Sequence, residues 1–143
     1  MRSKNQLPRG IRNNNPLNIR IGNDWQGEVN HPDDKDFEQF EAMKYGCRAA
    51  FIILHNYMIR HKLVTVPDIV KRWAPSSENA TDKYIKTVLE QTKFEETTVL
   101  SWWNKDQMCR LFLAMCYVEN GVVIDVSAIE EGYDLAVGRR VVI

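Results

Sequence analysis

The residue in the most unusual chemical setting is Glu119, which follows an apolar run and directly precedes Asn120-Gly121. A glycine at this position is typical of the left-handed residue that ends a helix. Glu119 would then lie in the last helical turn, where the helix dipole and apolar neighbours both disfavour its charged form. A carboxyl group that keeps its proton near neutral pH can act as the general acid in cleavage of a glycosidic bond. The alternative is a surface glutamate at the end of a helix.

Asparagine side chains are concentrated in RGIRNNNPLNIR, residues 9–20. Asparagines and a proline so close together disfavour a helix or a central strand, so we expect a loop. The amides of Asn15 and Asn18 could hydrogen-bond the hydroxyl and acetamido groups of a sugar, and the alternative is a structural turn. The N-terminal segment could also be a solvated arm or a patch for an anionic polymer, because it contains Arg2, Lys4, Arg9, Arg12 and Arg20.

Three other residues could line a sugar-binding groove. Trp25, two residues before Gly27, offers a flat ring for stacking, and Glu78 and Asn79 occupy a turn in RWAPSSENATDKY. The alternative for that turn is helix capping by Asn79 or Thr81, with Glu78 in solvent. The sequence does not choose a second carboxylate, and the acids near the Trp25 segment are Asp24, Glu28, Asp36 and Glu38.

Apolar periodicity predicts the helices that must position these residues, and residues 1–35 lack it and are expected to form loops. The predicted helices lie at about 46–61, 66–73, 81–91, 104–118 and 127–137. The expected N-caps are Thr65, Asn104 and Ser127, the last two with capping-box partners Gln107 and Glu130. Leu100 and Trp103 are expected to pack at the start of the 104–118 helix. The fold class is therefore predicted to be mainly α.

Length and composition narrow the class of protein further. The chain has 143 residues, so we predict one domain over 1–143 with residues 1–8 as a flexible arm. The formal net charge is zero, so no nucleic-acid partner is expected. No stretch is apolar enough to insert into a membrane, and we expect synthesis in the cytoplasm without a signal peptide. The cysteines and histidines lack the spacing of metal ligands, so neither a metal nor another cofactor is implied.

Several blocks of the sequence resemble those of known lytic proteins. NNNPLNIR, followed by a Trp-x-Gly turn and DFEQFEAMKYGCRAA, is similar to the part that follows the catalytic glutamate in lysozyme-like glucosaminidases. The chain from about Arg9 to Ala136 resembles small phage and prophage proteins described as virion-associated or lysozyme-like. The shared blocks are RNNNP-x-NIR, RWAP-x-x-EN-x-T-x-x-Y and ENG, in this order. The resemblance implies a mainly α, lysozyme-like single domain with a small irregular N-terminal lobe.

The order of the blocks departs from that of the enzymes. In lysozyme-like glucosaminidases and transglycosylases the catalytic glutamate ends an apolar helix ahead of the Asn-rich segment, whereas here no acidic residue precedes Asn13. A helix of that kind instead ends in Glu119, so we hypothesise a circular permutation of the lysozyme core, which is feasible because domain termini often lie close together. Glu119 would then face the segment Asn13–Asn18, and a separation above about 15 Å between Glu119 and the loop Asn15–Arg20 would exclude the hypothesis.

The resemblance implies cleavage of peptidoglycan glycan strands, by a muramidase or a lytic transglycosylase acting on the bacterial cell wall after release or delivery, or within a virion. Glu119 would be the general acid, and the expected groove contacts are Asn15, Asn18, Trp25, Glu78 and Asn79. The rival function is a non-catalytic structural or glycan-binding protein of a virion, which the lack of an assignable second carboxylate favours. A toxin or effector on the same scaffold is a third alternative, and the oligomeric state stays open.

Overall fold

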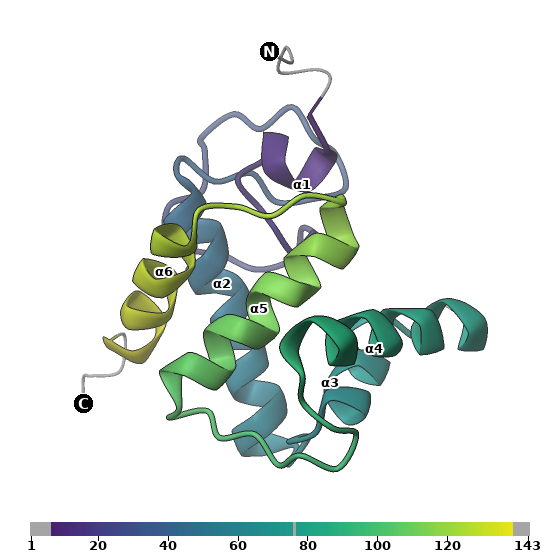
Figure 1. Ribbon diagram of the computed structural model, residues 1–143. Coiled ribbons are helices and arrows are strands. Elements are labelled where there is room, and N and C mark those ends of the chain that lie inside the picture. The colour runs from purple at the N-terminus through teal and green to yellow at the C-terminus, as the bar shows by residue number, and fades with distance from the viewer. Residues whose placement is uncertain (1–6, 76, 139–143) are drawn as a thin grey trace.

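The computed structural model describes residues 7–75 and 77–138, and helices dominate this part of the chain (Figure 1). The elements are α1 (Arg9–Arg12), α2 (Met43–His55), the π-helical turn η2 (Asn56–Arg60), α3 (Val66–Trp73), α4 (Glu78–Thr92), α5 (Lys105–Asn120) and α6 (Val126–Gly138). Strand pairing within the described residues is limited to isolated antiparallel bridges, between Arg20 and Phe37 and between Glu28 and Phe40. The predicted mainly α class is confirmed.

The core forms where α2, α5 and α6 meet, because each presents an apolar face to the others. Phe51 of α2 is fully buried, and its ring centre lies 4.5 Å from that of Phe112 on α5 and 5.5 Å from that of Tyr133 on α6. A Cβ atom on Gly132 of α6 would lie 2.4 Å from Cβ of Cys47 on α2. The absence of a side chain at Gly132 therefore permits the close crossing of α2 and α6.

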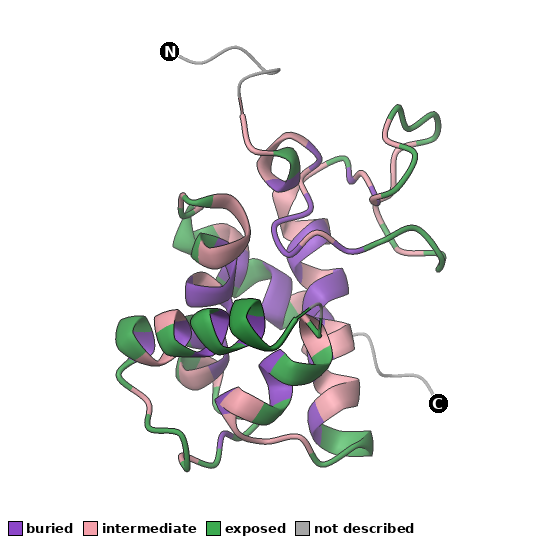
Figure 2. Cartoon of the chain, turned by 90° about the vertical axis from the view of Figure 1, so that its right-hand side faces the viewer, coloured by how far each residue is buried: buried purple, intermediate pink, exposed green. Residues whose placement is uncertain are grey.

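Helices α3 and α4 lie on the other side of α5 from α6 (Figure 1). Figure 2 shows buried residues on the faces where helices meet, whereas the loop between α1 and α2 extends from the helical body with exposed tips. Residues 1–6 of the predicted arm 1–8 lie outside the described residues. Pro8 is the N-cap residue of α1, and its carbonyl oxygen accepts a hydrogen bond from the Arg12 amide at 2.9 Å.

Helix capping follows the sequence at two of the three expected sites. Thr65 Oγ1 accepts the Asp68 amide at 3.4 Å, and Asn104 Oδ1 accepts the Gln107 amide at 3.0 Å. The prediction of Ser127 as a cap was wrong, because α6 begins at Val126 and Asp125, two residues before Ser127, accepts the Ser127 amide through its Oδ1 atom. Aspartate is among the preferred capping residues, and Asp125 stands directly before the first residue of the helix.

Other local predictions needed correction. The helix predicted at 46–61 begins at residue 43 and continues through the π-helical turn η2. The helix predicted at 81–91 begins at Glu78, because Ser77 Oγ accepts the Ala80 amide. Trp103 does not pack at the start of α5: it is 66% exposed, and the adjacent Trp102 is buried in its place.

Candidate active site

Glu119 lies in the last turn of α5, where residues distant in sequence meet it. Its Oε1 atom accepts a hydrogen bond from Asn18 Nδ2 at 2.9 Å, and its Oε2 atom accepts one from the Tyr84 hydroxyl at 3.0 Å. Gly121 then ends the helix with φ of 73°, as expected, and its amide donates to the Tyr117 carbonyl. The carboxyl group thus joins the Asn-rich loop, α4 and α5 in a single contact.

Burial is the main influence on the acidity of Glu119. It raises the pKa of the half-buried carboxyl group, while hydrogen bonds from Asn18, Tyr84 and Trp73 act in the opposite direction, and the net shift is upward. Burial and the adjacent Glu119 charge also raise the pKa of Tyr84 well above its usual value. Tyr84 therefore stays a proton-bearing donor, and Glu119 keeps its proton to higher pH than an exposed glutamate does.

The loop that carries Asn18 is fixed against the end of α5. Asn18 adopts a left-handed conformation with φ of 55°, and Asn120 Nδ2 donates to the Pro16 carbonyl at 2.8 Å. A Cβ atom on Gly10 would lie 2.5 Å from Asn120 Oδ1 and 2.9 Å from Asn18 Oδ1. Only a residue without a side chain fits there unless these amides move, so Gly10 sets how closely α1 approaches the candidate site.

Asn15 has a structural rather than an accessible position. It is fully buried, and its Nδ2 atom donates to the carbonyl oxygens of Ile19 and Glu38 at 2.9 and 3.0 Å. Its Oδ1 atom accepts the Ile19 amide at 2.9 Å. Both ends of the amide are used inside the loop, so the predicted sugar contact is replaced by the alternative reading, a structural turn.

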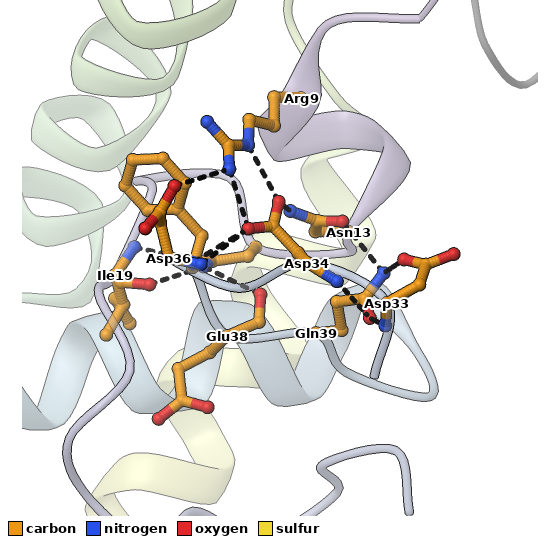
Figure 3. A network of polar contacts seen from close by, with 10 residues as sticks. Arg9, Asn13, Ile19, Asp33, Asp34, Asp36, Glu38 and Gln39 are labelled. Carbon is orange, nitrogen blue, oxygen red and sulfur yellow. Dashed lines mark hydrogen bonds and ion pairs between the residues drawn. The ribbon is translucent and has the colours of Figure 1, made fainter. Parts of the chain in front are cut away.

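A polar network fixes the loop from its other side (Figure 3). The Arg9 guanidinium donates to both carboxylate oxygens of Asp34 at 2.7 Å and holds the pKa of Asp34 well below its usual range. Asn13 Nδ2 donates to Asp34 Oδ2 at 2.9 Å, and Gln39 Nε2 donates to Asn13 Oδ1 at 3.0 Å. The sequence analysis placed Arg9 in a solvated arm or in a patch for an anionic polymer. In the structure Arg9 instead holds the loop in place.

The other predicted groove residues differ in how far their side chains are exposed to solvent. Trp25 is half-buried, with its backbone amide donating to Glu28 Oε2 at 2.5 Å. Glu78 and Asn79 are exposed in the first turn of α4, which Ser77 caps. Of the predicted groove residues, Asn18 contacts Glu119 directly. Glu78 and Asn79 lie on the same helix as Tyr84, and it is Tyr84 that contacts Glu119.

A surface groove of about 480 Å³ runs between α4 and α5 next to this junction. Its lining includes Tyr84, which contacts Glu119, together with Lys83, Tyr117 and Gly121. Tyr117 is 40% exposed. Within residues 7–75 and 77–138, no group of three or more potential ligands could hold a metal ion, and no helix is long and apolar enough to cross a membrane.

The fold and site define a mainly helical protein with a hydrogen-bonded carboxyl group at the junction of a helix and an Asn-rich loop. The chain is 38% identical over 121 residues to Protein P5 of Pseudoalteromonas phage PM2, an alignment that covers 82% of this chain and 74% of that protein. The chain therefore belongs to the family of this phage protein. No family model matches the chain.

Proposed function

We propose that this protein cleaves the glycan strand of peptidoglycan, with Glu119 as the general acid. The observation that carries the proposal is the setting of Glu119: a half-buried carboxyl group with a raised pKa, held by Asn18 and Tyr84. A carboxyl group with these properties at an accessible helix end matches the chemical demand of glycosidic-bond cleavage. Membership of a phage protein family is compatible with this activity.

The proposed bond lies between N-acetylmuramic acid and N-acetylglucosamine. Glu119 transfers its proton to the leaving oxygen as the bond from that oxygen to the anomeric carbon breaks. The resulting carboxylate keeps donors on both oxygens, Asn18 Nδ2 on Oε1 and the Tyr84 hydroxyl on Oε2. The anomeric carbon is then captured by water, as in a muramidase, or by a hydroxyl group of the substrate, as in a lytic transglycosylase, and the Glu119 carboxylate takes up the proton that the attacking oxygen loses.

The groove between α4 and α5 is the proposed path of the glycan strand. The exposed ring of Tyr117 offers a stacking surface for a sugar, and Lys83 offers a cation for the carboxylates of the polymer. Glu119 is not itself among the lining residues, and Tyr84, which lines the groove and donates its hydroxyl hydrogen bond to Glu119, connects the groove to the acid.

The contact between Asn18 and Glu119 also supports the permuted lysozyme-like scaffold. The residues are separated by 101 positions in sequence and by 2.9 Å in space, well inside the limit of about 15 Å that the hypothesis required. In this proposal the Asn-rich loop and the glutamate helix occupy the same relative places as in lysozyme-like enzymes, with their order in the chain exchanged.

A glycan-binding protein of the virion is the second candidate. It is favoured by the contacts of Glu119, which come from Asn18, Tyr84 and Trp73 and include no second carboxylate among the described residues. Such a protein would use the groove without breaking the bond.

The deciding experiment compares wall clearing by the wild type and Glu119→Gln across pH about 4–8, because glutamine keeps the shape and removes the proton. Glu90→Gln, at an exposed position on α4 that does not line the groove, is the matched control. The proposal expects clearing by the wild type and the control, and none by a folded Glu119→Gln. Walls that bind all three proteins and are cleared by none would favour the binding protein. The mass of the released fragments distinguishes a muramidase, which adds water, from a lytic transglycosylase, which leaves anhydro products.

A further inference from the structure

A pair of carboxyl groups, Glu28 and Glu38, lies in the loop between α1 and α2. Glu38 is only 4% exposed, and its Oε2 atom is buried without a hydrogen-bond partner among the described residues. The Glu28 carboxyl group adjoins that of Glu38, and its own Oε2 atom accepts the Trp25 amide. The arrangement leaves a buried acceptor oxygen beside a second acceptor.

Backbone hydrogen bonds on both sides of Glu38 fix its place in the loop, and its side chain is packed inside that loop. The Glu38 amide donates to the Ile19 carbonyl at 2.9 Å, and its carbonyl oxygen accepts Asn15 Nδ2 at 3.0 Å. Figure 3 shows the Glu38 carboxyl group directed away from the network of Arg9 and Asp34. Glu38 can therefore reach water only if the surrounding loop opens.

Three cations on the surrounding elements, Arg9, Arg20 and Lys44, are engaged elsewhere. Arg9 of α1 pairs with Asp34 and Asp36, and the Arg20 guanidinium lies over the Phe37 ring. Lys44 of α2 pairs with Glu131 and lies over the Tyr45 ring. The backbone amides of Gly22 and Asn23 donate to Glu38, but burial and the adjacent Glu28 outweigh them and raise the pKa of Glu38 to about 7.

A shared proton accounts for this geometry better than a metal ion does. If Glu38 is protonated, its hydroxyl can donate to the Glu28 carboxylate, which gives the isolated oxygen a partner and removes the like-charge contact. The other groups directed at the pair are the N–H donors of Gly22, Asn23 and Trp25. Such donors stabilise carboxyl oxygens, whereas a metal ion would require further oxygen ligands.

We infer that Glu28 and Glu38 share one proton and act as a pH-dependent latch that holds the loop 21–30 against the segment 36–41. Backbone hydrogen bonds join the two segments, from Val29 to the Gln39 carbonyl at 3.0 Å and from Glu41 to the Gly27 carbonyl at 2.7 Å. Loss of the proton places two negative charges together in a buried site, and their repulsion favours an open loop. Trp25, on this loop, then loses its fixed position.

The test is amide hydrogen exchange of the wild type, read at Val29 and Glu41 and corrected for the intrinsic effect of pH. An acid whose pKa is raised in the closed state holds its proton more tightly there, so opening becomes easier as pH rises. The opening equilibrium constant is expected to increase about tenfold per pH unit between about pH 5 and 7 and to level off above.

Two variants and a control make the result specific. Glu38→Gln, which keeps the shape and cannot ionise, should make opening at Val29 and Glu41 independent of pH. Glu28→Gln should reduce the pH dependence without abolishing it, because burial still acts on Glu38. Asp36→Asn, at an exposed position on the same segment, should leave the wild-type dependence in place.

A pH-independent opening in the wild type would overturn the inference, as would a wild-type pH dependence in Glu38→Gln. Loss of the pH dependence in the wild type on addition of Ca²⁺ or Mg²⁺ would also overturn it, because the pair would then hold a cation. Each measurement is made on the folded protein without substrate, so its outcome is independent of whether the glycan strand is cleaved.

Discussion

At the scale of single residues, the acidity of Glu119 reflects opposing effects. Burial favours the neutral form, and donors on both oxygens favour the charged form. The sequence predicts the first effect, because an apolar helix precedes the glutamate. It does not predict the second: apolar periodicity correctly assigns Tyr84 to the buried face of α4 but contains no information on where its hydroxyl group points.

Replacing Tyr84 by phenylalanine should change the pH dependence of activity. The variant removes a donor that lowers the pKa of Glu119, so that pKa rises further. Because a general acid must be protonated to act, the loss of wall clearing at high pH should move to higher pH. Tyr117→Phe, on the exposed side of the groove, is the control and should lose wall clearing over the same range of high pH as the wild type. If Tyr84→Phe instead loses wall clearing at a lower pH than the wild type, Tyr84 does not lower the pKa of the general acid.

Glu119→Gln should also change stability in a pH-dependent way. An acid with a raised pKa in the folded state makes folding less favourable as pH rises from its ordinary to its raised pKa, and the cost stays constant above. The variant lacks this cost, so its free energy of unfolding relative to the wild type should increase as pH rises above 4.5, the ordinary pKa of a glutamate, and then level off. Urea denaturation at several pH values measures it, and a pH-independent difference would argue against a raised pKa of Glu119.

At the scale of elements, close approaches at glycine fix the helix packing. The sequence predicts the helices through their apolar spacing, but it does not predict which glycine lies at a crossing. Gly10 and Gly132 both lie where a Cβ atom would meet a neighbouring element at 2.5 Å or less, whereas Gly138 has open space around its Cα atom. The distinction depends on the neighbouring element, which the local sequence does not encode.

Gly132→Ala should destabilise the protein by about 1–3 kcal/mol, because the new methyl group overlaps Cys47 on α2. The matched variant Gly138→Ala, in the same helix, should change stability by less than about 1 kcal/mol, in the stabilising direction. Thermal or chemical denaturation gives both values. Equal losses in the two variants would show that α6 does not depend on this close crossing.

Gly10→Ala should impair activity more than it impairs folding. The added methyl group would meet the side-chain oxygens of Asn18 and Asn120, and displacement of Asn18 removes a donor from Glu119. Wall clearing by this variant is compared with its melting temperature and with the same pair of measurements for Gly132→Ala. An inactive Gly132→Ala and a fully active Gly10→Ala, each folded, would contradict the assignment.

At the scale of the whole molecule, local sequence predicts the helical class, and long-range contacts assemble the site. Periodicity alone does not bring Asn18 to Glu119; that expectation came from the order of blocks shared with lytic proteins. Two side chains differ from the prediction: Asn15, expected to contact a sugar, is buried in its loop, and Trp103, expected to pack at the start of α5, is exposed. Both outcomes depend on how distant segments fill space, which no local pattern specifies.

The bond between Asn18 and Glu119 has a consequence for synthesis of the chain. Asn18 and Glu119 are separated by 101 positions in the sequence. A nascent chain therefore contains the Asn-rich loop long before it contains the glutamate. Loop closure over such a separation is slow compared with the formation of local helices. Translation fragments that stop before α5, or that lack the Asn-rich loop, therefore cannot assemble the junction, which forms only after nearly all of the described chain has been made.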